Sequence, residues 1–459
     1  MRTRLGLRDL NDIALKALPI YRGRRLHNRD ALASAIDLFS LQQSVPTAEL
    51  DALFDVRDQE ALFAATLLRR EGEAVRASAS LYPVGRDLVV SDHAWPQLDE
   101  GGRSTVPHDQ VMYVGTDSRW LARATVRKPI KAALDLCCGS GIHALLAAAH
   151  AEAATAVDIN ARAVRCTRFN ASLMGLRNLE ALEGDLYTPV GDRRFDLITA
   201  NPPFVPAPVQ EVGFRDGGPS GEDVQCRIVE GLPHHLAKGG TAQLVTELGE
   251  RASESLEPRL RAWLRGAPMD IHVVRLRAHS AEAYAIGHAH GDDARAVLQS
   301  VDRWAKNLAE QGFARVLSVL IAFRWSDDPW FRLDDAEVPS RDAGAEIDAI
   351  FAAERLSRDP DLLPRLRTGS ISRTGPVALV ETRGLGISVP ASIQARTVGQ
   401  AMPLNYVLDA IERDILTSTD RPTPTSELLS AGARASVPEE VILGSVVSLI
   451  RRGMIRPES

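Results

Sequence analysis

The segment Ala132-Ala-Leu-Asp-Leu-Cys-Cys-Gly-Ser-Gly141 decides the fold class of this chain of 459 residues. Its first five residues are typical of a buried strand, and the glycines after them predict a tight turn. A helix is expected to follow, from His143 to Ala149. This order is typical of ligand-binding α/β folds, because the turn lets the backbone approach a ligand and the helix N-terminus favours a carboxylate or phosphate.

Strand-like and helix-like segments alternate beyond this point. The strand candidates are Thr155–Val157, Leu179–Leu182, Phe195–Ala200, Thr241–Thr246, His272–Leu276 and Val316–Ala322. The clearest helices between them are Ala161–Met174, Asp223–Ala237 and Asp293–Gln311. Such alternation predicts a parallel sheet with helices on its faces. We therefore expect an α/β, Rossmann-like domain over residues 96–340.

Acidic residues follow two of the predicted strands. Asp158 ends the second strand, where a carboxylate can accept both hydroxyls of a ribose. Asp185 follows the third, where it can accept from an exocyclic amine such as adenine N6. The segment Gly139-Ser-Gly-Ile-His-Ala144 also fits the loose pattern of nicotinamide enzymes. Because parallel strands end at one edge of a sheet, these groups are expected to share one site.

The fourth strand ends in Asn201-Pro-Pro-Phe204. Two prolines remove two backbone donors and stiffen the loop, so it presents carbonyl oxygens in a fixed direction. Asn201 adds a side-chain oxygen and Phe204 adds a flat apolar face. This set suits a planar nitrogen group. The alternative is a proline-rich turn with a structural role only.

Taken together, the four strand ends resemble class I S-adenosylmethionine-dependent methyltransferases of the N-methylating branch with an Asn-Pro-Pro-aromatic motif. The chain is similar to release-factor glutamine and rRNA guanine methyltransferases over residues 110–335. The resemblance implies S-adenosyl-L-methionine as cofactor, with the ribose on Asp158, the adenine on Ile159 and its edge at Asp185 and the Leu186 amide. The other implied cofactor contacts are Tyr113, Gly115, Asp135, Cys137, Gly139, Gly141 and Asn201. Cys137 stands where the family has its first glycine, which narrows the space beside the methionine carboxylate.

The resemblance also implies a catalytic role for the fourth strand end. Asn201 and the Pro202 carbonyl would accept hydrogen bonds from the target nitrogen and stabilise the positive charge that grows on it. Phe204 would fix the plane of the target group. Alignment matters more than acid–base chemistry in a displacement of this kind.

The loop after the motif is rich in acids (Glu211, Asp216, Glu222 and Asp223). Acids favour a cationic or planar nitrogen, so we expect a small-molecule or amino-acid-like substrate, in a biosynthetic pathway. The alternatives are methylation of rRNA guanine or adenine, methylation of a protein glutamine and, as a lesser one, a cofactor-sensing transcriptional regulator. The net charge of −6 disfavours nucleic acid, although residues 1–40 carry eight Lys/Arg against four Asp/Glu.

The flanking segments predict two smaller domains. Residues 1–95 read as a helical, winged-helix-like domain, with a helix over Ala61–Arg70 and a hairpin over Val75–Val90 around Gly85. Residues 341–459 read as an α+β, winged-helix-like domain, with strands between Thr368 and Val389 and a helix over Leu404–Leu416. Because residues 401–459 hold six Arg and eight Asp/Glu, packing or homodimerisation is expected there rather than DNA binding.

The overall composition is that of a globular protein, with 45% hydrophobic and 25% charged residues. The four cysteines lack metal-ligand spacing and are too few for a disulfide framework, so we expect no metal and a cytoplasmic location. Neither a secretory signal nor a membrane span is expected from the apolar runs.

Overall fold

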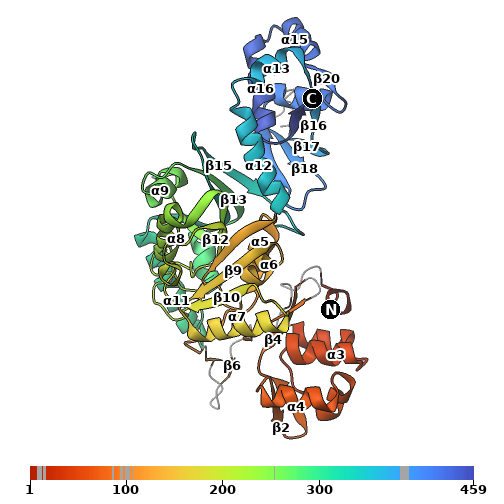
Figure 1. Ribbon diagram of the computed structural model, residues 1–459, viewed down its shortest axis with the longest axis vertical. Helices are drawn as coiled ribbons and strands as arrows, with labels where there is room; N and C mark the ends of the chain where they lie inside the picture. Colours follow the sequence, from red (N-terminus) through yellow and green to blue (C-terminus); the bar gives the residue numbers. More distant parts are fainter. Residues whose placement is uncertain are drawn as a thin grey trace. The chain divides into compact units, whose positions relative to one another are not determined.

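The structure is a computed structural model that describes residues 1–7, 13, 17–84, 87–93, 97–98, 104–105, 107–252, 254–382 and 392–458 (Figure 1). The chain divides into two compact units. Unit 1 comprises Met1–Arg119, Pro129–Ala267 and Ser280–Ala314, and unit 2 comprises Trp120–Lys128, Pro268–His279 and Arg315–Ser459. Within the described ranges, none of the helices has both the length and the hydropathy of a membrane span.

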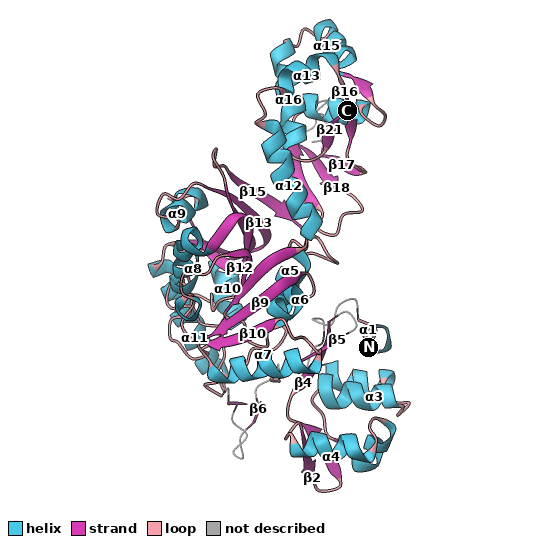
Figure 2. Cartoon of the chain, in the orientation of Figure 1, coloured by secondary structure: helices cyan, strands magenta, loops and turns pink. Residues whose placement is uncertain are grey.

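Unit 1 contains the parallel sheet that the sequence predicts. Its strand order is β10-β9-β8-β11-β12, and all neighbours pair in parallel. Three of these strands, β9, β10 and β12, are labelled in Figure 2. The strands are β8 (Ile130–Leu136), β9 (Ala151–Asp158), β10 (Leu179–Glu183), β11 (Phe195–Ala200) and β12 (Leu236–Arg251). Helices α6 (Ile142–Ala148), α7 (Ala161–Leu173) and α8 (Asp223–His235) connect them, and α9 (Leu256–Trp263), α10 (Ala281–His288) and α11 (Ala294–Glu310) follow. The expected α/β, Rossmann-like arrangement of a parallel sheet with connecting helices is therefore confirmed.

The N-terminal part of unit 1 is small and mixed. It holds α1 (Arg2–Leu5), α2 (Leu18–Ile20), η3 (Tyr21–Arg25), α3 (Ala31–Ala35), η4 (Ile36–Ser40), η5 (Thr47–Ala52) and α4 (Val56–Ala64). Its sheet β1-β3-β2 is formed by Val45–Pro46, Ala74–Ala77 and Leu68–Glu71. The predicted helix Ala61–Arg70 was wrong beyond Ala64, because Leu68 enters the apolar core as the first residue of a strand.

A hairpin of β4 (Ser80–Val84) and β5 (Asp87–Ser91) follows, while Gly85 and most of residues 94–106 lie outside the described residues. The short strands β6 (Gln97–Leu98) and β7 (Ser104–Thr105) pair there. The hairpin is attached to α7 through Asn170, which donates to the Val90 carbonyl at 2.8 Å and accepts from the Val90 N–H at 2.9 Å. The winged-helix likeness of this part stays a prediction.

In unit 2, hydrogen-bonded strands follow one another in the order β14-β13-β15-β19-β18-β17. These strands are β13 (Met269–Ser280), β14 (Phe313–Trp325), β15 (Phe331–Ala336), β17 (Val377–Thr382), β18 (Ser392–Thr397) and β19 (Leu404–Leu408). A smaller sheet, β20-β16-β21, is formed by Thr423–Pro424, Ser370–Arg373 and Ile455–Pro457. The helices are α12 (Gly344–Ser357), α13 (Leu362–Thr368), α14 (Ala410–Ser418), α15 (Thr425–Arg434) and α16 (Glu439–Arg451), and α5 (Thr116–Ala124) begins in unit 1.

The predicted helix Leu404–Leu416 was wrong in its first half. Residues Leu404–Leu408 alternate between buried and exposed, which is the period of a strand. A helix begins only at Ala410. Its first turn is capped by Asp409, just before the helix, and Glu412, within it, which form a reciprocal capping box. Of the predicted strands between Thr368 and Val389, the part from residue 383 onward, with Gly384, lies outside the described residues.

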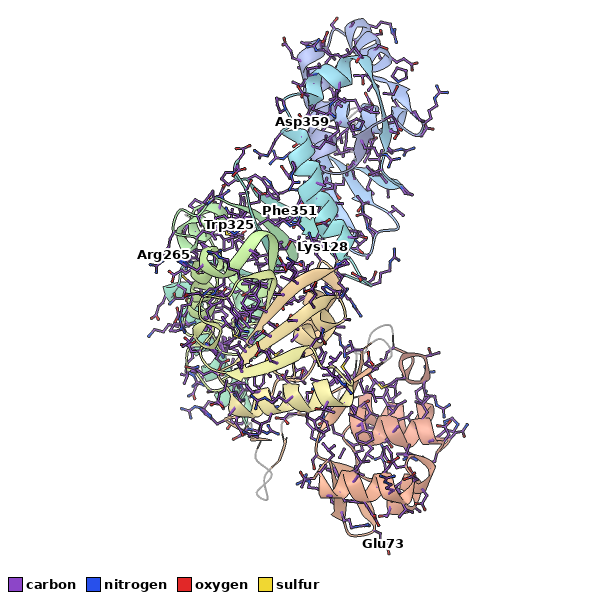
Figure 3. All side chains as sticks on the ribbon, in the orientation of Figure 1. Glu73, Lys128, Arg265, Trp325, Phe351 and Asp359 are labelled. Atoms are coloured by element: carbon purple, nitrogen blue, oxygen red, sulfur yellow. The ribbon has the colours of Figure 1, made fainter. Side chains whose placement is uncertain are left out.

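Unit 2 also holds a group of polar residues that we name the Arg332 cluster (His272, Arg332, Asp334, Glu354, Tyr406 and Arg451). All of them are buried except Arg451, whose side chain is 45% exposed. Arg332 donates to Asp334 at 2.8 Å, to Glu354 at 3.3 Å and to the Tyr406 hydroxyl at 2.8 Å. Arg451 on α16 also donates to Glu354, at 2.8 Å. Phe351 on α12, labelled in Figure 3, packs edge-on against His272 with ring centroids 6.2 Å apart. The cluster joins β13, β15, β19, α12 and α16.

Candidate active site

A cavity of about 640 Å³ lies in unit 1 at the carboxyl ends of β8, β9, β10 and β11. Most of the residues that the sequence predicted for the site line it, namely Tyr113, Cys137, Gly139, Asp158, Ile159, Asp185, Leu186 and Asn201. Gly115, Asp135, Gly141, Pro202 and Phe204, all of them described residues, do not line the cavity. Residues at the ends of four separate strands therefore line one cavity, as the sequence predicted.

The turn after β8 is left-handed at three positions. The φ angles of Cys137, Gly139 and Gly141 are +55°, +54° and +84°. Gly139 faces open space, because a Cβ atom placed on it would meet nothing within 4 Å. At Gly141 the same atom would lie 2.6 Å from the Thr167 side chain, so this glycine is required for packing. The turn leaves room for a ligand beside Gly139.

Two acids of the predicted site accept hydrogen bonds from their surroundings, and one of the donors, the Gly139 N–H, belongs to this turn. Asp135 is buried and accepts from the Thr199 hydroxyl at 2.9 Å and the Ala144 N–H at 3.3 Å. Burial raises its pKa to about 7, although these hydrogen bonds oppose the shift. Asp158 accepts from the N–H groups of Gly139 and Asn160, at 2.8 Å and 2.9 Å. Burial raises the pKa of Asp158 as well, against the effect of these donors.

Residues that directly follow β9 and β10 also line the cavity. Ile159 follows Asp158 and is 73% exposed, so an apolar side chain is available to a ligand there. Asp185 forms an ion pair with Arg227 of α8 at 2.6 Å, and both residues line the cavity. Leu186 adopts a φ of +48°, which is uncommon for a residue with a side chain. These features fit an adenosine group, with a carboxylate available to its hydroxyl and amine donors.

The Asn-Pro-Pro-Phe motif presents only part of itself to the cavity. Asn201 lines it, and its Nδ2 donates to the Ser118 hydroxyl at 3.0 Å. Pro203 lines the cavity, whereas Pro202 and Phe204 are buried, Phe204 with 9% of its surface exposed. The roles assigned to these residues stay predictions, and the stacking role of Phe204 has the least support from this geometry.

Several cavity residues were missed from the sequence, notably Ser118, Phe214 and Arg227. Ser118 lies three residues after Gly115 in α5, so it could have been found as a neighbour of the Tyr113–Gly115 segment. Phe214 belongs to the loop after the motif and Arg227 to the first turns of α8. No sequence motif indicates that Phe214 or Arg227 lines the cavity at the strand ends.

Two of the four acids after the motif, Asp216 and Glu222, are buried, whereas Glu211 and Asp223 are exposed. Asp216 is 2% exposed and accepts from the N–H groups of Glu211 and Val212, both at 2.8 Å. Glu222 is buried beside Arg259, with 2.9 Å between Oε1 and Nη1. These two carboxylates therefore order the loop and are not available to attract a cationic substrate.

Comparison with known proteins agrees with this geometry. Residues 113–264 match the methyltransferase small domain family, and residues 17–78 match a domain of unknown function, DUF7059. A ribosomal protein uL3 glutamine methyltransferase of Bradyrhizobium diazoefficiens is 41% identical over 26% of this chain and 41% of its own length. A release factor glutamine methyltransferase of Geobacter sulfurreducens is 36% identical over 27% of this chain and 48% of its own. The chain thus spans less than half the length of these two relatives.

A third relative is covered more fully. The putative protein N5-glutamine methyltransferase of Methanocaldococcus jannaschii is 32% identical over 145 residues, which are 30% of this chain and 73% of that protein. The cavity fits S-adenosyl-L-methionine, because Gly139 leaves open space and Asp158, Ile159 and Asp185 surround it. The chain therefore belongs to the class I S-adenosylmethionine-dependent methyltransferases of the N-methylating, Asn-Pro-Pro-aromatic branch.

Proposed function

We propose that this enzyme methylates the side-chain amide nitrogen of a glutamine in a protein. The observation that carries the proposal is the position of Asn201, whose amide lines the cavity beside Ser118. The names of the three relatives support it, since each is described as a glutamine methyltransferase. A protein glutamine was an alternative in the sequence analysis, and these relatives favour it over the small-molecule substrate expected there.

The loop acids explain why the small-molecule expectation is less favoured. Glu222 and Asp216 were counted as attraction for a cation, yet both are buried and occupied by partners within the loop or by Arg259. A neutral carboxamide requires no such charge. It requires hydrogen-bond acceptors in a fixed direction. This is the role proposed for Asn201, which lines the cavity, and for the carbonyl of Pro202, whose side chain is buried.

S-adenosyl-L-methionine supplies the methyl group when it is bound. The chain must hold the acceptor nitrogen in line and remove its lone pair from conjugation with the carbonyl. The Asn201 oxygen and the Pro202 carbonyl oxygen would accept the two N–H groups of the glutamine amide and stabilise the developing positive charge. One of these two protons, made acidic by the methylation, would then leave to solvent and restore a neutral amide. Ser118 accepts from Asn201 Nδ2, so it leaves Oδ1 of Asn201 for the substrate. The proposed site of action is the cytoplasm.

Transfer of a labelled methyl group tests the proposal. The full chain would be incubated with labelled S-adenosyl-L-methionine and, separately, ribosomal protein uL3, release factor, ribosomal RNA and free amino acids. We expect label in a protein fraction, and mass spectrometry should place one added methyl on a glutamine side chain. Replacing that glutamine with glutamate in the acceptor should abolish labelling. Label confined to RNA or to free amino acids would reject the proposal.

A further inference from the structure

The loop from Val205 to Gly221 is closed on itself and fixed against the motif. Its centre is Asp216, whose Oδ2 accepts from two backbone N–H groups and whose Oδ1 accepts from Arg215 Nε at 2.6 Å. Asn307 of α11 is 7% exposed and donates to the carbonyls of Pro206 and Pro219, at 3.0 Å and 2.9 Å. Both ends of the loop are thereby attached to one helix, so the loop has a defined shape.

The loop lies directly against the backbone of the motif. The Arg215 carbonyl accepts from the N–H groups of Phe204 and Val205, at 3.1 Å and 2.9 Å. Gly221 approaches so closely that a Cβ atom on it would lie 2.3 Å from the Phe204 carbonyl oxygen. Because Phe214 immediately precedes Arg215, these contacts hold Phe214 next to the strand end that carries Asn201.

Two phenylalanines are thus candidates for the flat face beside the acceptor. Phe204 belongs to the motif but is buried and does not line the cavity, whereas Phe214 is partly exposed and lines it together with Gln210 and Gly213. An aromatic ring packs well on a planar amide and excludes water from it. The motif therefore provides the acceptors, and the loop provides the apolar wall.

We propose that Phe214 is the residue on which the acceptor carboxamide packs, and that the loop Val205–Gly221 is the element that selects a planar, uncharged side chain. This inference rests on the proposed function. Asp216 and Asn307 act as positioning residues, because they hold the loop that carries Phe214.

The test uses the full chain and the protein acceptor that the labelling experiment identifies. Phe214→Ala should raise the KM for the acceptor about tenfold, the change that corresponds to about 1.4 kcal/mol. Phe214→Tyr keeps the ring and should leave this KM within about twofold of the original. Val209→Ala is the matched control, since Val209 is in the same loop, is 57% exposed and does not line the cavity. Phe214→Leu replaces the alanine variant if the latter does not fold.

Calorimetry of S-adenosyl-L-homocysteine binding shows whether Phe214 contacts the acceptor or the cofactor. Its Kd should be unchanged in the Phe214 variants. A rise in that Kd equal to the rise in KM would place Phe214 in the cofactor wall and overturn the inference. An unchanged acceptor KM in Phe214→Ala would overturn it while leaving the proposed function intact. If the original chain labels no protein, the proposed function fails, and this inference fails with it.

Discussion

Asp135 in unit 1 and Asp334 in unit 2 are buried to a similar degree, yet the pKa shifts of their carboxyl groups are opposite. Burial raises the pKa of Asp135 to about 7. Burial would also raise the pKa of Asp334, but the hydrogen bond from His272 and the charge of Arg332 outweigh it and lower the pKa. The Arg332 cluster is internally neutralised. Asp135 and Asp158, in contrast, lose more to burial than their hydrogen bonds return, and this leaves them electrostatically unbalanced, whereas Asp185 pairs with Arg227. Such imbalance is typical of a functional site, and neutralised clusters are typical of structural ones.

The largest expected effect is the loss of activity when a residue of the cavity is replaced. Asn201→Ala should lower kcat at least about 1,000-fold, because the acceptor for the target N–H is lost. The Kd for S-adenosyl-L-methionine should rise less than about tenfold. Single-turnover transfer and calorimetry measure the two quantities, and thermal unfolding serves as the control for folding. Loss of cofactor binding together with turnover would make Asn201 part of the scaffold rather than of the catalytic site.

The next largest effect is a loss of stability when a residue of the Arg332 cluster is replaced. Arg332→Met should destabilise unit 2 by about 3 kcal/mol, because Asp334 and Glu354 are left buried with one cationic partner fewer. Hydrogen exchange in β15 and α12 should become faster, while the cofactor Kd stays unchanged.

Arg396→Met is the matched control in the same sheet. Arg396 pairs with Glu337, and about half of each side chain is exposed, so its loss should cost less than about 1 kcal/mol. Equal destabilisation by the two variants would contradict the view that the Arg332 cluster is the structural one.

A smaller effect concerns pH. Because the folded-state pKa of Asp135 lies above its unfolded value of 3.8, its contribution to stability is complete below that value and is lost as pH rises towards 7. The loss is at most about 1.4 kcal/mol per pH unit. Asp135→Asn should abolish this dependence in urea unfolding between pH 4 and 7.

The contribution of Asp334 to stability should depend on pH in the opposite direction, and Asp334→Asn tests this. The lowered pKa of Asp334 means that its contribution is present above 3.8 and is lost as pH falls through the folded-state value. The variant should therefore remove stability at neutral pH. Parallel pH profiles for both variants would show that the two carboxylates do not differ in the way the contrast requires.

The sequence was sufficient for the strand ends but not for the side chains between them. Asp158, Asp185 and Asn201 could be predicted to meet, since the end of a parallel strand fixes the edge on which a residue lies. Phe204 was assigned to the cavity because it completes the motif, yet Phe214 lines it. The position of Phe214 at the cavity depends on Asp216 and Asn307, which shape a loop through contacts distant in sequence.

The strand Leu404–Leu408 was missed for a different reason, because its alternation spans only five residues beside a longer helix.

Cys137 gives the smallest effect and the sharpest test of strain in the cavity region. A left-handed φ costs a residue with a side chain about 1–2 kcal/mol, while glycine adds about 0.5–1 kcal/mol of unfolded-state entropy. Cys137→Gly should therefore stabilise unit 1 by no more than about 1.5 kcal/mol. It should leave the cofactor Kd equal or lower, because Cys137 lines the cavity. Cys138→Ala is the control. Cys138 is buried and does not share the left-handed φ, so loss of its sulfur should destabilise. If Cys137→Gly destabilised as much as Cys138→Ala, the thiol of Cys137 would be a packing element and the cavity turn would not be strained.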